Sequence, residues 1–213
     1  MSTNNLGCLR PYVKVAQLLN PQFRESLINQ FSTIKGFLIN FQIPLICAFG
    51  IYARGKMVEV GCWFGRTSSV LLFSSDDLKL FCVDTFRGSE EHQSELQGRY
   101  FREDFEKTLA PYRGRYVIHE GMSHEVAVQF EDNSLDYVWI DASHDYLNVK
   151  RDVEVWTPKL KLGGLLLGHD YPEPTDPNGG FEELTRAVNE TVRDSSLFSD
   201  FGYFCGIWGA RKL

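Results

Sequence analysis

The feature that most constrains this chain is a repeated alternation of short apolar runs with longer amphipathic segments. Helical spacing of apolar residues fills the intervals, as at Val149, Val153 and Trp156. Strands that alternate with helices predict βαβ crossovers and a parallel sheet that is covered on both faces. The apolar runs that we expect to be parallel strands are residues 57–61, 78–83, 116–119, 135–140 and 165–168.

Two segments lie outside this alternation. Residues 201–205 and 207–211 flank Gly206, which predicts a C-terminal antiparallel hairpin beside the parallel strands. Residues 1–54 are predicted to form an N-terminal helical extension, which could close over a site or pack across a homodimer. The predicted fold is therefore α/β, with a Rossmann-like, doubly wound and mostly parallel seven-stranded sheet in residues 55–213.

The remaining elements follow from apolar spacing and from turn residues. We expect residues 87–98 to be a polar loop, and Gly163-Gly164 to turn into the strand that begins at Leu165. A second loop is expected from Tyr171 to Gly180. The predicted helices are residues 45–53, 65–73, 99–109, 126–130, 147–160 and 181–192.

Composition excludes some functions. The chain has 213 residues and a formal net charge of −6, which disfavours a protein that binds along nucleic-acid phosphates. The five cysteines lie far apart and form no CxxC pair, which fits a reducing, cytoplasmic compartment. The apolar segment 36–52 is interrupted by Asn40, Gln42 and Pro44, so it is too short and too broken to span a bilayer. We expect no membrane association.

Polar residues gather where the predicted strands end. In an open parallel sheet, ligands bind outside the carboxyl ends of the strands, so these residues predict the position of a site. They are Gly61, Asp84, Glu120, Asp141, His169 and Asp170.

A glycine loop follows the first strand, in the run Glu59-Val-Gly-Cys-Trp-Phe-Gly-Arg-Thr-Ser68. A dinucleotide loop has a second glycine where this chain has Trp63, which would block a pyrophosphate. A triphosphate loop needs a GK[ST] sequence, and none is present. The loop therefore favours a ligand with an adenosine and no phosphates. An acidic residue at the end of the next strand, here Asp84, can accept both ribose hydroxyl hydrogens.

This pattern, ExGxxxGxxS, resembles motif I of the class I S-adenosylmethionine-dependent methyltransferases. The resemblance implies that residues 55–213 form the domain that binds S-adenosylmethionine. It places Glu59 near the methionine part of the donor, and Met122 and Ser123 near the adenine. The other residues that it implies for cofactor binding are Gly61, Gly65, Thr67, Ser68, Asp84 and Asp141.

Acids and histidines follow the fourth and fifth strands. Asp141 and His144 end one strand, and His169 and Asp170 end the next. These strands are expected to be neighbours in a doubly wound sheet, so we expect the four side chains to converge. A neutral imidazole can take the proton of an alcohol because its pKa lies near working pH.

The DxxH and GG…HD sequences are similar to those of the O-methyltransferases that modify sugars and natural products, and more distantly to catechol and caffeoyl-coenzyme-A O-methyltransferases. The resemblance implies catalytic roles for Asp141, His144 and Asp170, with His144 as the general base. It implies that Asp141, His169 and Asp170 bind a divalent cation. His169 stands where an oxygen ligand is usual, which indicates a metal softer than Mg²⁺, a histidine outside the metal's ligand shell, or no metal.

These observations favour methylation of a small-molecule hydroxyl, on a sugar or a secondary metabolite, with Mg²⁺, Mn²⁺ or a similar ion as the metal. Two alternatives stay open, a nicotinamide-dependent oxidoreductase on the same fold and a non-catalytic module that binds an adenosyl ligand. The loops 87–98 and 171–180 could be lids over the site. Candidate substrate walls are Trp63, Phe86, Arg87 and Tyr171.

Overall fold

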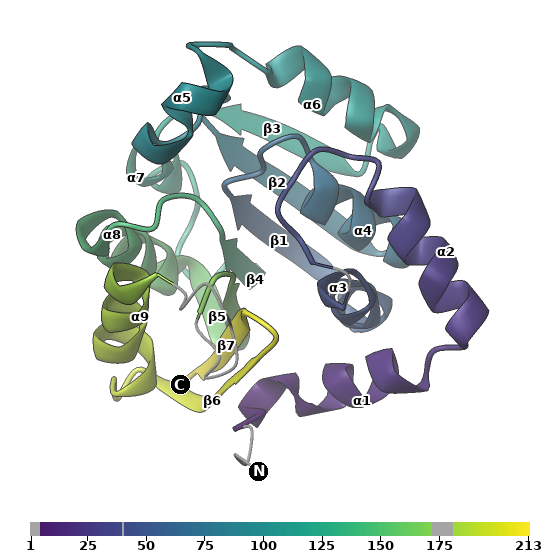
Figure 1. Cartoon of the computed structure of the whole chain (residues 1–213). Helices are drawn as coiled ribbons and strands as arrows, with labels where there is room; N and C mark the ends of the chain where they lie inside the picture. Colours follow the sequence, from purple (N-terminus) through teal and green to yellow (C-terminus); the bar gives the residue numbers. More distant parts are fainter. Residues whose placement is uncertain (1–4, 40, 172–180) are drawn as a thin grey trace.

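A computed structural model describes residues 5–39, 41–171 and 181–213. Its described part contains a seven-stranded sheet in the order β3-β2-β1-β4-β5-β7-β6. The first five strands run parallel, whereas β7 pairs antiparallel with both β5 and β6. The predicted fold class and the C-terminal hairpin are therefore confirmed (Figure 1). The strands are β1 (Gly55–Val60), β2 (Leu78–Asp84), β3 (Tyr116–Glu120), β4 (Leu135–Ile140), β5 (Leu160–Gly168), β6 (Phe198–Phe204) and β7 (Ile207–Lys212).

Helices cover both faces of the sheet, and successive strand residues point to opposite faces. Met57 packs with the helices of one face, and its neighbour Val58 packs with those of the other. The first face holds α1 (Arg10–Leu18), α2 (Pro21–Phe31), α3 (Gln42–Tyr52), α4 (Arg66–Ser74), α5 (Gln93–Leu96) and α6 (Arg102–Leu109). The second holds α7 (Ser123–Ala127), α8 (Tyr146–Trp156) and α9 (Glu182–Val188).

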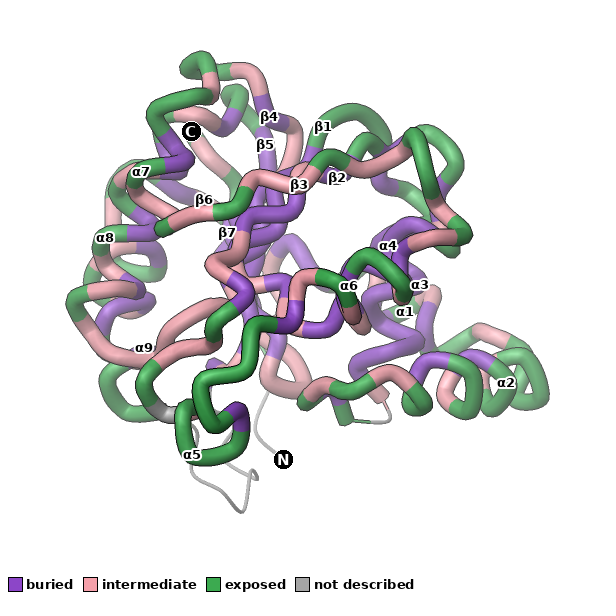
Figure 2. The backbone as a smooth tube through the Cα atoms, turned by 90° about the horizontal axis from the view of Figure 1, so that it is seen from above, coloured by how far each residue is buried: buried purple, intermediate pink, exposed green. Residues whose placement is uncertain are grey.

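Burial follows this layering. Figure 2 shows buried residues along the central strands β4 and β5 and exposed residues along much of α2 and α5. Helix α3 is buried from Gln42 to Gly50, as expected for its almost unbroken apolar sequence. Among the described residues, no helix is long and apolar enough to cross a membrane.

Several element boundaries differ from the sequence predictions. Residues 87–98 were expected to be a loop, but they contain a 3₁₀ turn (Glu90–His92) and α5. Helix α7 begins at Ser123 rather than at residue 126, because the turn at Gly121 brings the chain into the helix directly. Helix α8 ends at Trp156 rather than at residue 160, since Pro158 cannot continue the hydrogen-bond ladder.

Strand β5 also differs from the prediction. It begins at Leu160, five residues before the predicted Leu165, and Gly163-Gly164 lie inside it. Gly163 has a φ of +77°, and the pairing with β4 shifts register between Leu135 and Tyr137. The two glycines therefore form an irregularity within the strand rather than a turn before it.

The N-terminal helices pack directly on the sheet domain. Arg66, the first residue of α4, donates hydrogen bonds to the carbonyl oxygens of Ser32, Ile34 and Leu38. These bonds hold the connection between α2 and α3, residues 32–39, against the start of α4. The division of the chain into an extension, residues 1–54, and a domain, residues 55–213, stays a prediction.

Candidate active site

A cavity of about 940 Å³ lies at the carboxyl ends of the parallel strands, where the sequence predicted a site. This volume is in the range of a small-molecule site. Its lining includes nine of the predicted site residues, Gly61, Thr67, Asp84, Met122, Ser123, Asp141, His144, His169 and Asp170. Glu59, Gly65 and Ser68, which were also predicted to bind the cofactor, do not line it.

The glycine loop forms one wall of the cavity. Gly61 has a φ of +85°, and a Cβ atom there would lie 2.0 Å from the carbonyl oxygen of Asp141. Gly65 also has a positive φ, +86°, and precedes α4. Both positions therefore favour glycine, because few other residues adopt a positive φ. At position 61 there is also no room for a side chain, because the loop crosses the end of β4 there.

Asp84 holds this loop in place. Its Oδ2 accepts the backbone N–H groups of Cys62 at 2.7 Å and Trp63 at 2.9 Å, and its Oδ1 accepts that of Phe86 at 2.7 Å. Burial raises the pKa of Asp84, and the backbone donors act against that shift. A carboxylate has about four lone-pair sites, so Asp84 can still accept a hydrogen bond from a ligand in the cavity.

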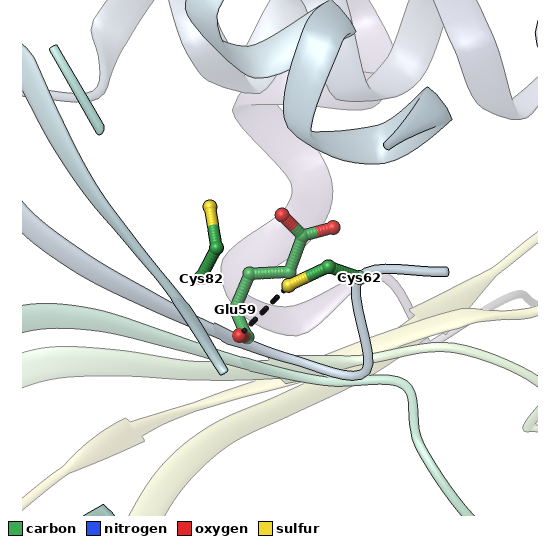
Figure 3. A group of neighbouring side chains, drawn as sticks. All are labelled: Glu59, Cys62 and Cys82. Carbon is green, nitrogen blue, oxygen red and sulfur yellow. Dashed lines mark hydrogen bonds between the residues drawn. The ribbon is translucent and has the colours of Figure 1, made fainter. Parts of the chain in front are cut away.

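Glu59 lies behind the loop with two cysteines, Cys62 and Cys82 (Figure 3). Glu59 is fully buried, and Ser68 donates a hydrogen bond of 2.5 Å to its Oε2. Among the described residues, none hydrogen-bonds to Oε1. Burial raises the pKa of Glu59 well above its usual value, which favours the neutral form of this carboxyl group.

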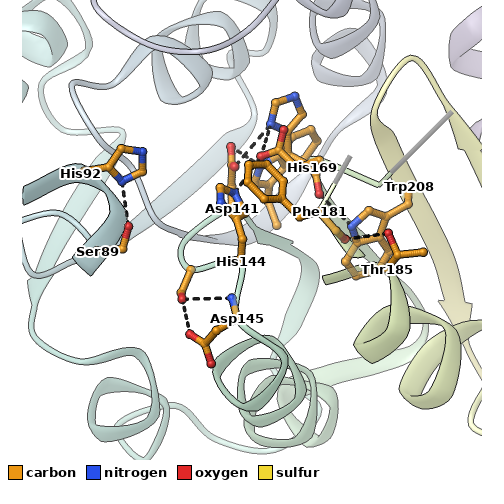
Figure 4. A network of polar contacts seen from close by, with 12 residues as sticks. Ser89, His92, Asp141, His144, Asp145, His169, Phe181, Thr185 and Trp208 are labelled. Atoms are coloured by element: carbon orange, nitrogen blue, oxygen red, sulfur yellow. Dashed lines mark hydrogen bonds and ion pairs between the residues drawn. The ribbon is translucent and has the colours of Figure 1, made fainter. Parts of the chain in front are cut away.

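The predicted acid–histidine residues converge at the ends of β4 and β5, and Figure 4 shows Asp141, His144 and His169 close together. His169 Nδ1 lies 3.0 Å from Asp170 Oδ2 and 3.5 Å from Asp141 Oδ1. His144 Nε2 lies 3.0 Å from the same Oδ2 of Asp170. Asp170 therefore joins the two histidines, and we call these four residues the acid–histidine cluster.

Charge compensation explains how the acid–histidine cluster can be buried. Burial lowers the pKa of His169, but Asp141 and Asp170 outweigh that effect and raise it to about 10. Burial alone would raise the pKa of Asp170, but His169 and His144 lower it. The two carboxyl groups therefore favour the protonated form of His169 and offset the cost of burying its charge.

Backbone geometry fixes the end of β5. Asp170 has a φ of +60°, an uncommon conformation for a residue with a side chain. The Trp208 indole donates to the carbonyl oxygen of His169 at 3.2 Å. A Cβ atom on Gly168 would lie 2.4 Å from the Trp208 ring, so the strand end can approach β7 only through glycine.

Of the four candidate substrate walls, Trp63 lines the cavity. Phe86 and Tyr171 are core residues, with exposed fractions of 0% and 5%. Arg87 stacks over Tyr100. The first predicted lid contributes Gly88, Ser89, Glu90 and His92 to the lining. The second, apart from Tyr171, lies outside the described residues.

The sequence matches the model of a methyltransferase domain over residues 58–171, which is more than half of the chain. That stretch contains the glycine loop, Asp84 and the acid–histidine cluster. The chain belongs to the methyltransferase-domain family.

Solved structures with the same fold include several methyltransferases. A candidate caffeoyl-CoA O-methyltransferase from Staphylococcus aureus has a TM-score of 0.64 at 17% identity, covering 96% of this chain and 99% of that one. An O-methyltransferase from Bacillus cereus, solved with SAH, has a TM-score of 0.59 at 15% identity, covering 93% and 96%. An O-methyltransferase from Streptomyces achromogenes involved in tomaymycin synthesis, solved with SAM, has a TM-score of 0.57 at 14% identity, covering 94% of each chain.

A curated relative, an uncharacterized protein from Sinorhizobium fredii, is 30% identical over 123 residues. The match covers 54% of this chain but only 13% of that protein.

Three atoms of the acid–histidine cluster could hold a metal ion. Asp141, His169 and Asp170 each offer one ligand atom, and these atoms lie within 4.8 Å of one another. The pairs at 3.0 and 3.5 Å have about the spacing of neighbouring ligands on an ion that is about 2.1 Å from each. One imidazole and two carboxylates suit Mn²⁺, Fe²⁺ or Zn²⁺ better than Mg²⁺.

Sequence reasoning missed part of the cavity wall. Residues 35–38, between α2 and α3, line the cavity, and Phe37 stacks on His92 with ring centroids 5.2 Å apart. No local pattern in residues 35–38 indicated this contact, since it depends on how Arg66 folds the segment back. The second miss was Asp152 on α8, a carboxyl group between the apolar positions Val149 and Val153. A charged residue so close to the buried stripe was a usable signal.

We predict that Glu59→Gln makes the methyltransferase more stable at alkaline pH. The pKa of Glu59 is higher in the folded protein than in the unfolded chain. The free energy of unfolding of the wild type therefore falls as the pH rises from the pKa of the unfolded chain towards that of the folded protein. Each unit of difference corresponds to about 1.4 kcal/mol. Glutamine cannot ionise and can still accept the hydrogen bond from the Ser68 hydroxyl. The difference in free energy of unfolding between the variant and the wild type should therefore favour the variant more at pH 8 than at pH 5. Urea denaturation at both pH values measures it.

The exposed Glu131 offers a matched control, since Glu131→Gln removes a carboxylate outside the core. A Glu59→Gln protein that loses stability equally at both pH values would show that the buried carboxyl is ionised.

Proposed function

We propose that this methyltransferase transfers a methyl group from S-adenosylmethionine to a hydroxyl of a small molecule, a sugar or a secondary metabolite. The observation that carries the proposal is that the glycine loop and the acid–histidine cluster line one cavity. Solved structures with SAM or SAH bound share the fold, which supports the choice of cofactor.

In this proposal the cofactor lies along the carboxyl edge of the sheet. Met122 and Ser123 flank the adenine, Asp84 accepts from the ribose, and Gly61 and Thr67 border the methionine part. Glu59, Gly65 and Ser68 act indirectly, because they shape the loop from behind its wall. Trp63 at the loop argues against a dinucleotide, whose pyrophosphate needs glycine there.

The chemistry assigned to the acid–histidine cluster is deprotonation of the acceptor. Methyl transfer is an in-line displacement on an activated carbon, so the protein must supply proximity and a deprotonated oxygen. His144 is the general base, and Asp170 at 3.0 Å orients its ring and stabilises the imidazolium that forms. Phe181 stacks on His144 with ring centroids 3.8 Å apart and limits the ring's movement.

Asp141, His169 and Asp170 would hold a divalent cation in this proposal. Such a cation, when bound, would lower the pKa of the acceptor hydroxyl and orient it. Without a bound cation, the carboxylates of Asp141 and Asp170 would lie beside the expected position of the sulfonium and attract its charge.

We expect isothermal titration calorimetry to show binding of S-adenosylhomocysteine to the wild-type protein. The substitution Asp84→Asn should lower the affinity for S-adenosylhomocysteine about tenfold or more, because a hydrogen bond from a hydroxyl to a carboxylate is worth roughly 1.5–3 kcal/mol. Asparagine keeps an oxygen that can hold the loop amides, so the variant should stay folded. A folded wild-type protein that binds NADH at micromolar concentration and not S-adenosylhomocysteine would favour the oxidoreductase.

We also expect His144→Gln to lower methyl transfer by about 10²- to 10⁴-fold, the usual contribution of a general base. Transfer from radiolabelled S-adenosylmethionine to a panel of small phenols and sugars measures it, with and without a chelator. S-adenosylhomocysteine should bind the variant with unchanged affinity. Unchanged turnover in His144→Gln would show that another group removes the proton.

A further inference from the structure

We propose that Glu59, Cys62 and Cys82 form a binding site for a thiophilic divalent cation such as Zn²⁺, in the core behind the glycine loop. This thiol–carboxyl site is separate from the acid–histidine cluster and does not rest on the proposed function. A bound cation would tie the glycine loop to the two strands that carry the other ligands, β1 and β2.

The backbone brings the three side chains together. Glu59 on β1 and Cys82 on β2 are register partners in neighbouring parallel strands, so their side chains leave the same face of the sheet. Gly61 turns the chain at the end of β1, and the Cys62 thiol donates to the carbonyl oxygen of Glu59 at 3.4 Å. One ligand atom of each of the three residues lies within 4.8 Å of those of the other two (Figure 3).

This spacing is close to what a metal ion requires. Zinc binds carboxylate oxygen at about 2.0 Å and cysteine sulfur at about 2.3 Å, in a tetrahedral arrangement. Neighbouring ligand atoms of such an ion are roughly 3.3–3.8 Å apart. Small rotations of the three side chains would therefore complete three sides of the coordination shell.

The donor atoms favour a soft or borderline cation. Zn²⁺ accepts both cysteine sulfur and carboxylate oxygen as ligands, whereas Mg²⁺ and Ca²⁺ prefer oxygen alone. The Ser68 hydroxyl donates to Glu59 Oε2 at 2.5 Å and holds the carboxyl group in place, as is usual for a carboxylate that binds a metal. Each thiol that binds the ion gives its proton to solvent, so two thiolates and one carboxylate surround the charge.

Glu59 supplies an independent sign of a missing partner. The residue is completely buried, and within residues 5–39, 41–171 and 181–213 no group hydrogen-bonds to its Oε1. A buried polar atom without a partner costs free energy, and such atoms are uncommon in native proteins. A cation held between this oxygen and the two sulfur atoms would remove that cost.

The thiol–carboxyl site lies directly behind the cavity wall. Cys82 and Cys62 have exposed fractions of 0% and 2%, yet Cys62 is one of the residues that line the cavity. The glycine loop therefore separates the site from the cavity. A cation in the cavity would reach the site through a movement of this loop, and the bound cation would then restrict the loop.

Absorption spectroscopy with Co²⁺ tests the proposal, because cobalt bound by thiolates has a charge-transfer band in the near ultraviolet. We expect the reduced, metal-free protein to develop this band as Co²⁺ is added, up to one cobalt–thiolate centre per chain. A cobalt ion in the acid–histidine cluster gives no such band, since that cluster contains no sulfur.

Cysteine variants assign the band to the thiol–carboxyl site. Cys62→Ala and Cys82→Ala should each lower the Co²⁺ affinity by about 100-fold or more, because even residues that only orient a ligand contribute roughly 10- to 100-fold. Cys47→Ala is the matched control. Cys47 is 1% exposed, much like Cys82, but it lies on α3 and outside the site, so this variant should keep the full band.

A wild-type protein without the band, or a band that survives in both Cys62→Ala and Cys82→Ala, would overturn the proposal. X-ray absorption at the zinc edge needs only the wild type, and so covers the case in which the variants do not fold. With one equivalent of Zn²⁺ we expect two sulfur neighbours at about 2.3 Å, and fewer than two would contradict the proposal. Neither measurement involves S-adenosylhomocysteine, so a failure here does not bear on the proposed function.

Discussion

The structure depends on one close approach, the crossing of the loop after β1 over the end of β4. Gly61 lies against the backbone of Asp141, and no side chain fits between them. Asp84 fixes the crossing from the other side by accepting two N–H groups of the loop. Because β1, β2 and β4 are adjacent in the sheet, these contacts bring the glycine loop and the acid–histidine cluster to one cavity.

Burial of charge is the second constraint. Two carboxylates and two histidines occupy the ends of β4 and β5, and each acid lies beside an imidazole. These close pairs compensate the charge that the partly buried site contains. Glu59, by contrast, accepts from the Ser68 hydroxyl and has no cation beside it in the described part of the chain, and burial raises its pKa.

The sequence predicted the sheet and the convergence of the acid–histidine cluster because both follow from local patterns. Apolar runs, glycine turns and polar strand ends are set by neighbouring residues, and a parallel sheet places all such ends at one edge. The sequence also predicted that β4 and β5 are neighbours and that the C-terminal hairpin is antiparallel. Residue-level patterns did not predict the shift of β5, since Gly163 adopts a positive φ inside a strand only through its pairing with β4.

Contacts between segments that are distant in the chain could not be predicted from the sequence. Arg66 folds residues 32–39 over the cavity through backbone carbonyls, which have no side-chain signature. Trp156 on α8 donates to Ser123 on α7, a contact that no pattern within either helix indicated. Asp152 itself was visible as a charge beside a buried stripe, but its direction into the cavity was not.

The most direct measurement is a crystal structure of the protein with S-adenosylhomocysteine. We expect the adenine between α7 and α8, the ribose at Asp84, and the sulfur facing Asp141, His144 and Asp170. A sulfur atom directed away from these three residues, or density for a pyrophosphate beside Trp63, would contradict the account.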